Sequence, residues 1–275
     1  MVKIGINLKD KVVVFVANEE EKEKYASSLV GEFQVRDIIV GVIGNAAQGN
    51  FITDYYMSTP NKLVFQFDDD LQFDGVFHPP FMENKDKPET PDFERYVKFA
   101  IDTMKKYDIT TCLFSNSSNM FQKNDYWAAV RPKSLESQAW GGFPREYHKV
   151  PTWVTHGVDV SRSSQVHEKD GAILLFNGFI LHDAQGYGKR PGGMQAVGGR
   201  TPEMVNRIYA EISGMPDWYF PPAPAGSNAN MTTVRFKPWP SLRKQMPNKI
   251  KYVEFEQPFG EANAKHYPAQ RLETS

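Results

Sequence analysis

Three consecutive carboxylates, Asp68, Asp69 and Asp70, follow an apolar run in residues 63–73, which read LVFQFDDDLQF. Like charges at this spacing repel one another unless a cation lies among them. Mg²⁺ and Mn²⁺ prefer oxygen ligands and would relieve this repulsion. The residue types therefore predict a divalent-metal site. A solvated turn is the alternative, because aspartate is common in loops and at helix starts.

A second group of candidates lies in residues 179–199, where an apolar strand runs into a glycine-rich loop. His182 and Asp183 lie at the predicted end of this strand. His182 is a candidate further ligand of the same metal ion, and Asp183 is a candidate general base for an acceptor hydroxyl. Gly193 permits the close approach of a ligand, and Arg200 would hold a phosphate. For each of these residues the alternative is an ordinary surface position.

Aromatic residues provide a third group of candidates. Trp140 and Gly142 belong to a WGGF segment that would suit a sugar ring, because an aromatic face stacks on the sugar and glycine leaves room for it. Core packing of Trp140 is the alternative. Towards the C-terminus, basic residues alternate with Phe236, Trp239 and Tyr252. Such a mixture suits a nucleic-acid backbone with an exposed base.

Alternating strands and helices would position these groups. Residues 11–17 (KVVVFVA) predict a fully buried strand and residues 35–42 predict a second strand, with a helix that starts with several glutamates between them. Residues 62–67 and 109–114 predict further strands, residues 51–58 and 94–106 predict helices, and residues 44–50 (GNAAQGN) predict a loop. This order predicts an α/β fold with a mixed, mostly parallel sheet flanked by helices. Ligands of such sheets gather at the carboxyl ends of the strands, where we expect the three aspartates.

The second half of the chain predicts fewer regular elements. Residues 140–153, 186–199 and 220–229 are rich in glycine, proline, asparagine and aromatic side chains, so we expect long loops there. Residues 172–181 predict a strand, or a strand pair broken at Asn177 and Gly178. Residues 201–214 predict a helix, because a threonine and a proline stand at its start.

Composition narrows the classes of function. The net charge of −1 gives no global basic field that would attract nucleic acid. The single cysteine, Cys112, excludes a disulfide framework within one chain. No stretch reaches the roughly 18 apolar residues of a membrane span, and the N-terminus lacks the apolar region of a signal peptide. We therefore expect a cytoplasmic protein without membrane contact.

The order of these parts resembles the nucleotide-binding half of GT-A glycosyltransferases, in which an aspartate motif ends a central strand. The resemblance depends on the first strand, the segment GVIGNAAQGNFITDYY at 41–56 and the DDD triplet, and it covers about the first 110 residues. More narrowly, the chain resembles the TET-associated glycosyltransferases that modify bacteriophage DNA.

This resemblance implies a GT-A-like (Rossmann-like) fold and a metal-dependent transfer of a sugar from a nucleotide-sugar donor, with a UDP-sugar favoured. The implied acceptor is the hydroxyl of a hydroxymethylated pyrimidine, 5-hydroxymethylcytosine, in phage DNA. Asp70 would bind Mn²⁺ or Mg²⁺ directly, and Asp68 would face the ribose or a metal-bound water. The implied donor-binding residues are Phe15, Val16, Asn18, Gln48, Asn50, Asp68 and Asp69, and the candidate metal ligands are Asp68, Asp70 and His182. The alternatives are core packing for Phe15 and a helix cap for Asn50.

We therefore expect residues 1–222 to form one catalytic domain, with a nucleotide-sugar-binding half at 1–110 and an acceptor half at 111–222. Residues 223–275 would pack on it as an extended basic segment. Two other functions stay open at this point. One is a sugar nucleotidyltransferase, since these enzymes also use carboxylates at strand ends. The other is a non-catalytic module that binds glycan or nucleic acid.

Overall fold

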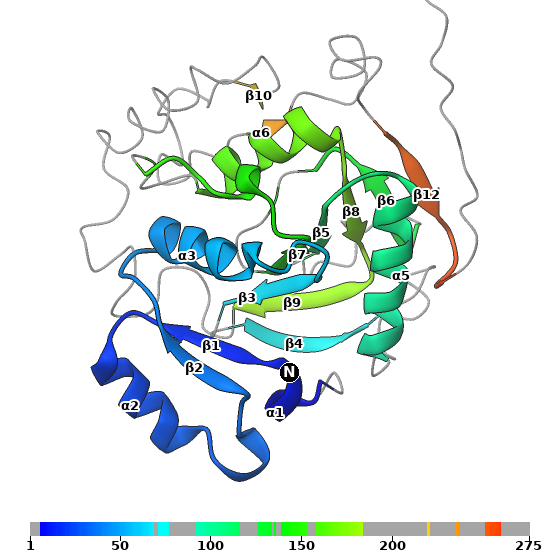
Figure 1. The fold of residues 1–275 in the computed structure, drawn as a ribbon. Coiled ribbons are helices and arrows are strands. Elements are labelled where there is room, and N and C mark those ends of the chain that lie inside the picture. The colour runs from blue at the N-terminus through cyan, green and yellow to red at the C-terminus, as the bar shows by residue number, and fades with distance from the viewer. Residues whose placement is uncertain are drawn as a thin grey trace, which may run out of the picture.

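A computed structural model describes residues 6–68, 71–76, 92–115, 126–133, 135, 139–152, 154, 158–183, 219–220, 235–236 and 251–259. A short helix, α1 (Leu8–Lys11), opens the described chain. Helices flank a mixed sheet (Figure 1), so the α/β class expected from the sequence is confirmed.

The first large unit is a parallel β-α-β arrangement. β1 (Val13–Val16) pairs in parallel with β2 (Asp37–Val40), and the chain between them forms α2 (Glu19–Ser28) and the 3-10 turn η2 (Gly31–Phe33). The Asn18 side chain accepts a hydrogen bond from the Glu21 amide at 2.9 Å, and three glutamates in the first turn meet the positive end of the helix dipole. The structure confirms both predicted strands and the helix between them, but β1 is not fully buried as predicted, since only Val16 of its four residues is buried.

Six strands form the main sheet in the order β12–β6–β8–β5–β7–β3 (Figure 1). Their bounds are β3 (Val64–Phe67), β5 (Thr111–Phe114), β6 (Ala128–Arg131), β7 (Ala139–Gly142), β8 (Ile173–Phe176) and β12 (Val253–Phe255). β5 and β8 pair in parallel, whereas the other four ladders of the described sheet are antiparallel. β3, β5, β8 and β12 consequently run in one direction, and β7 and β6 run in the other. The sheet is therefore mixed, as expected, and β5–β8 is the one parallel ladder among the described pairs of this sheet.

β7 is the strand that interrupts the parallel arrangement between β3 and β5, and it lies in a segment that the sequence predicted as a loop. A Cβ on Gly141 would lie 2.5 Å from the Phe65 ring, and a Cβ on Gly142 would lie 2.8 Å from the Thr110 carbonyl oxygen. Glycine inside a strand often marks such a close approach. Here the glycines permit a buried strand, which the glycine content alone did not indicate.

α3 (Asn45–Met57) starts at Asn45, whereas the sequence predicted a loop at 44–50 and a helix from Phe51. Gly44 precedes the helix with a φ of 103°, a conformation that favours glycine. Ala46 packs against a cluster of three valines, and Gly49 is buried against α6. These tertiary contacts stabilise a first turn whose helix propensity is weak.

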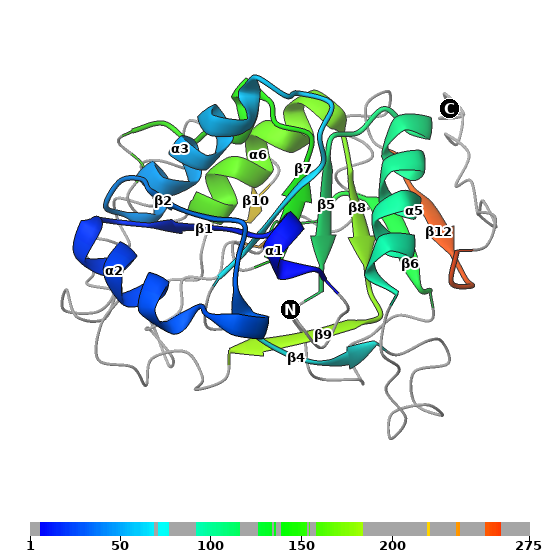
Figure 2. The same cartoon turned by 60° about the horizontal axis from the view of Figure 1, so that its bottom comes forward.

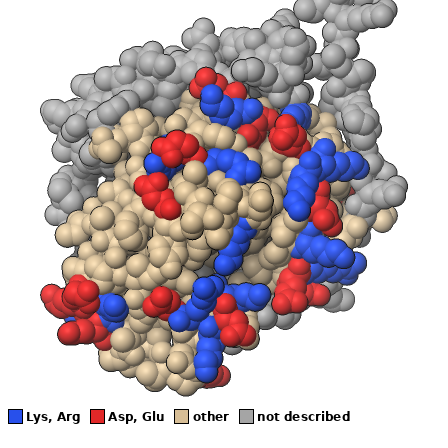
Figure 3. All heavy atoms as spheres, viewed as in Figure 1, with Lys and Arg blue, Asp and Glu red and all other residues tan. Residues whose placement is uncertain are grey.

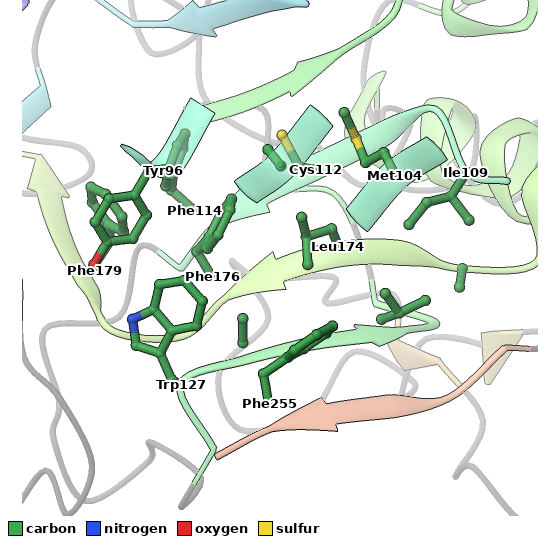
Figure 4. Packing of buried hydrophobic residues seen from close by; sticks show 14 of the residues in the cluster. Tyr96, Met104, Ile109, Cys112, Phe114, Trp127, Leu174, Phe176, Phe179 and Phe255 are labelled. Carbon is green, nitrogen blue, oxygen red and sulfur yellow. The ribbon is translucent and has the colours of Figure 1, made fainter. Parts of the chain in front are cut away.

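Helices cover both faces of the main sheet. α5 (Phe93–Lys106) packs against one face through Tyr96, Ala100 and Met104. α6 (Val158–Asp170) packs against the other face through Val166, and Figure 2 shows the two helices on opposite sides of β5 and β8. Figure 4 shows the larger core, an aromatic cluster between α5 and the sheet. The sheet is therefore the middle layer of three.

Two further strand pairs lie outside the main sheet. β4 (Leu71–Val76) pairs in antiparallel fashion with β9 (Phe179–Asp183), and β10 (Tyr219–Phe220) pairs with β11 (Arg235–Phe236). β8 and β9 follow one another across Asn177 and Gly178, which confirms the predicted broken strand pair. The helix predicted at 201–214 lies outside the described residues. None of the helices that the structure describes is long and apolar enough to cross a membrane.

The late segment 251–259 joins the main sheet. β12 pairs with β6, and its residues Val253 and Phe255 are buried. The Lys251 ammonium donates to the Asp108 carbonyl oxygen at 2.7 Å. Within the expected basic segment 223–275, residues 253–255 thus form an edge strand of the sheet.

Candidate functional site

The acidic segment lies where β3 ends and β4 begins. Asp68 follows β3 directly and is exposed, and its carbonyl oxygen accepts a hydrogen bond from the Leu71 amide at 3.4 Å. Asp183, the last residue of β9, pairs with Leu71, and His182 pairs with Gln72. The fold therefore brings the backbone of His182 and Asp183 beside Leu71 and Gln72, which directly follow the acidic triplet, although the two strands lie far apart in the sequence (Figure 1).

The side chains that would hold a metal ion are mostly outside the described part of the structure. This applies to Asp69 and Asp70 and to the side chains of His182 and Asp183. Among the side chains that are described, no group of three His, Cys, Asp or Glu residues is placed to hold a metal ion. The metal site therefore stays a prediction, which depends on the types of the donors and on the backbone register.

The ends of three strands meet at the same edge of the main sheet. β3, β5 and β8 share one direction, so Asp68, Ser115 and Asn177, which follow them, lie along this carboxyl edge. Asn177 anchors the edge, because its backbone N–H donates to the Trp127 carbonyl oxygen at 2.9 Å and its side chain is buried. Ligands of α/β sheets gather at this kind of edge.

Three of the expected donor-binding residues lie in β1 or two residues after it. Phe15 packs edge-on against the rings of Phe51, Tyr55 and Tyr56 of α3, at centroid distances of 5.5–6.3 Å. Val16 is buried, and Asn18 caps α2. Each side chain thus has a packing or capping role, and this fits the alternative stated for Phe15.

Gln48 and Asn50 belong to α3 rather than to a loop. The Gln48 side-chain oxygen accepts the Val42 amide at 2.7 Å, which ties the β2–α3 connection to the helix. Asn50 makes two hydrogen bonds to Val150: its Nδ2 donates to the carbonyl oxygen at 2.7 Å, and its Oδ1 accepts the amide at 2.8 Å. Asn50 therefore does not cap a helix at Phe51, as the sequence analysis had allowed, and holds a distant backbone segment instead.

We expect Asn50→Ala to lower the free energy of unfolding by about 1–3 kcal/mol, because it leaves the Val150 amide and carbonyl without their partners. Asn45→Ala, an exposed substitution in the first turn of α3, is the matched control. Urea denaturation measures both variants. Unchanged stability of Asn50→Ala would show that the two hydrogen bonds contribute nothing, and a donor role for Asn50 would then be favoured.

Trp140 and Gly142, the expected sugar platform, are buried. Only 3% of Trp140 is exposed, its ring packs edge-on against His148, and the Arg162 guanidinium lies 4.7 Å from its ring centroid. A sugar platform needs an open ring face, so the buried position fits core packing, the alternative stated for Trp140. Gly193 and Arg200 lie outside the described residues.

The candidate nucleic-acid surface is only partly described. Arg235 and Phe236 form β11, and Lys251 and Tyr252 precede β12, whereas the residues between them, Trp239 included, lie outside the described part. On the face drawn in Figure 3, lysines and arginines alternate with aspartates and glutamates. The described part of this face therefore carries no single-sign field that would by itself attract a nucleic acid.

A buried polar network that the sequence did not indicate lies at the opposite, amino edge of the sheet. The Asp170 carboxylate accepts hydrogen bonds from the Thr110 amide and hydroxyl at 2.8 and 2.6 Å and from the Tyr147 hydroxyl at 2.8 Å. The His148 Nε2 lies 3.1 Å from the hydroxyls of Thr110 and Thr111. The network joins the end of α6, the start of β5 and the 3-10 turn η4 (Glu146–His148), so we interpret it as a structural clamp.

The clamp predicts a specific dependence of stability on pH. Burial lowers the pKa of His148 from 6.5 to about 3, with smaller contributions from the charges of Arg162 and Arg145. The unfolded chain therefore binds a proton near pH 6.5, whereas the folded protein stays unprotonated at this residue down to about pH 3. The stabilisation that this difference in pKa gives the folded protein is complete above pH 6.5. As the pH falls below 6.5, it is lost by about 1.4 kcal/mol per pH unit.

We expect His148→Gln to reduce the slope of the free energy of unfolding against pH between about pH 6 and about pH 4. The reduction corresponds to about one proton fewer bound on unfolding. Buried His167, whose pKa burial lowers to about 4, contributes a slope of its own that this variant retains. Urea titrations at several pH values give both slopes. An unchanged slope in His148→Gln would contradict the assignment.

The chain matches no protein-family model, and no curated protein sequence matches it.

Proposed function

We propose that the protein is a metal-dependent glycosyltransferase, which moves a sugar from a nucleotide-sugar donor to an acceptor hydroxyl. The observation that carries this proposal is the pairing of β4 with β9, because it brings the His182–Asp183 backbone beside the acidic segment at the carboxyl edge of the sheet. In this proposal the two segments would have complementary roles, the first as donor-side carboxylates and the second as an acceptor-side base. The parallel β1–α2–β2 unit, followed by α3, supports a nucleotide-binding half.

The donor set fits a hard divalent ion, since Asp68, Asp70 and His182 supply oxygen and imidazole ligands, as Mn²⁺ and Mg²⁺ accept. When bound, the ion would neutralise the negative charge of the departing nucleoside diphosphate. Asp183 would accept the proton of the acceptor hydroxyl as that oxygen attacks the sugar. Buried Asn177 would keep the edge beneath these groups fixed through its hydrogen bond to Trp127.

The acceptor that we propose to test first is 5-hydroxymethylcytosine in DNA. Its 5-substituent faces the major groove, where an enzyme can reach the hydroxyl. The full-length protein is incubated with Mn²⁺, a panel of nucleotide sugars and hydroxymethylcytosine DNA, and both nucleoside diphosphate release and the mass of the base are measured.

The outcomes of this assay distinguish a transferase from a nucleotidyltransferase and from a non-catalytic binding module. Release of nucleoside diphosphate with a gain of one sugar mass on the base supports the complete proposal. Release of diphosphate with transfer to another acceptor would retain the transferase and reject DNA. Formation of pyrophosphate from a sugar phosphate and a nucleoside triphosphate would indicate a nucleotidyltransferase instead, and binding without turnover would indicate a non-catalytic module.

A further inference from the structure

Phe259 has a backbone conformation that its residue type disfavours. It follows Pro258 in a turn, and its φ of 56° lies in the left-handed region that glycine and asparagine normally occupy. Among the described residues, Asp108 is the other non-glycine residue with a positive φ, and aspartate tolerates this region better. A bulky residue keeps such a conformation only where its contacts compensate for the strain. The contacts of the Phe259 ring therefore hold this turn closed.

The Phe259 ring packs on aromatic side chains of α5 and of the segment that leads into β6. Its centroid lies 4.9 Å from the ring of Tyr96 and 4.8 Å from that of Trp127. Arg95 of α5 is exposed, and its guanidinium carbon lies 4.1 Å from the Phe259 centroid, which is within the range of a cation–π contact. Phe259 itself is half-buried, so this packing borders the solvent.

Trp127, which contacts Phe259, contains a buried polar group without a partner. The residue is 0% exposed, and its indole Nε1 has no hydrogen-bond acceptor among the described residues. A buried donor of this kind destabilises the closed arrangement, whereas water would satisfy it after an opening. The strained turn and the indole N–H thus both favour opening of the same contact.

Residues 126 and 127 connect this contact to the carboxyl edge of the sheet. On one side the Trp127 N–H donates to the carbonyl oxygen of Phe255, the last residue of β12, at 2.8 Å. On the other side Asn177 donates its side-chain Nδ2 to the Tyr126 carbonyl oxygen at 3.2 Å and its backbone N–H to the Trp127 carbonyl oxygen at 2.9 Å. Asn177 begins the turn from β8 into β9, so one short segment joins β12 to that turn (Figure 2).

We propose that residues 253–259, which we call the latch, open and close while the rest of the fold stays intact. β12 is only three residues long and lies at the edge of the described sheet, so a local opening breaks few contacts. In the open state β12 leaves β6, the strain at Phe259 is released, and the Trp127 indole N–H reaches water. The β8–β9 turn then loses support through residues 126 and 127 and becomes more mobile. This inference does not depend on sugar transfer, and its test uses no ligand.

Native-state hydrogen exchange of the full-length protein, resolved to single amides by NMR at several low urea concentrations, tests the latch. We expect the Trp127 amide to exchange at least about 100-fold faster than the amides of β5. Its rate should depend little on urea, because a local opening exposes little surface. Equal rates and an equal urea dependence for Trp127 and β5 would overturn the proposal, since the latch would then open only when the whole protein unfolds.

Two variants separate the contribution of the ring from that of the guanidinium. Phe259→Ala removes the ring contacts and is expected to raise the exchange rates of the Trp127 and Asn177 amides at least about tenfold. Arg95→Met keeps the ring and removes the cation, and it is expected to raise both rates about threefold. Lys98→Met, at an exposed position of the same helix, is the matched control and is expected to exchange as the wild type does.

The amides of β5 are expected to keep their wild-type rates in all three variants. If Phe259→Ala raises the rate of Trp127 but leaves that of Asn177 unchanged, the link to the β8–β9 turn is rejected. If neither rate changes, the latch is rejected as a whole. Arg95→Met decides both points if Phe259→Ala does not fold.

Discussion

Replacing Asp70 with asparagine is expected to reduce metal-dependent sugar transfer by about 10³-fold, which corresponds to about 4 kcal/mol of transition-state stabilisation. The reason is that the amide keeps the size of the carboxylate but loses the charge that would bind a hard dication in the proposed site. The measurement is the initial rate of nucleoside diphosphate release at saturating Mn²⁺. Raising the Mn²⁺ concentration should restore part of the rate, because the affinity for the metal is what the substitution weakens.

Asp102→Asn is the matched control, since Asp102 is an exposed aspartate on α5. It is expected to retain the wild-type rate within about twofold, because exposed charges contribute little. If Asp70→Asn transfers sugar as fast as Asp102→Asn at every Mn²⁺ concentration, the acidic segment does not hold a catalytic metal.

The second large effect concerns stability. Phe176→Ala is expected to lower the free energy of unfolding by about 3–5 kcal/mol, the range found for buried phenylalanines. Phe176 is 1% exposed, stacks on Phe114 at a centroid distance of 5.3 Å and contacts the rings of Tyr96 and Trp127 at 5.5 and 5.7 Å (Figure 4). Alanine would leave a cavity that these rings cannot fill without losing their own contacts.

Chemical denaturation of Phe176→Ala is compared with that of Phe33→Ala, because Phe33 is 48% exposed in η2. The exposed substitution is expected to change stability by about 0.5 kcal/mol or less. A loss below about 1 kcal/mol in Phe176→Ala would show that the aromatic cluster relaxes around the gap.

The elements that could be predicted are those whose pattern is local. The apolar run of β1, the glutamate-rich start of α2 and the amphipathic spacing of α5 all appear in the sequence, and the structure has each of them. The first turns of α3 and the strand β7 could not be predicted in this way. Gly49 and Gly141 look like loop residues in isolation, and only their contacts with Arg162 and Phe65 explain why a helix and a strand contain them.

The site was predictable in part for the same reason. The types of Asp68 and Asp183 indicated candidates at two strand ends, but only the register of β4 and β9 brings those ends together. Conversely, Trp140 and Asn50 have side chains that suit ligands, and the structure gives them partners within the protein. A sequence states which groups are available for chemistry, whereas long-range pairing decides which of them are already engaged.

The pairing of β12 with β6 affects how the chain can be synthesised. Residues 253–255 form the edge of a sheet whose other strands end by residue 176. Until residues 253–255 have been synthesised, the edge of β6 that will pair with β12 has unpaired amides and carbonyls. Such an exposed edge can pair with another nascent chain. A chaperone that covers this edge of β6 until translation passes residue 255 would therefore reduce aggregation of the nascent chain.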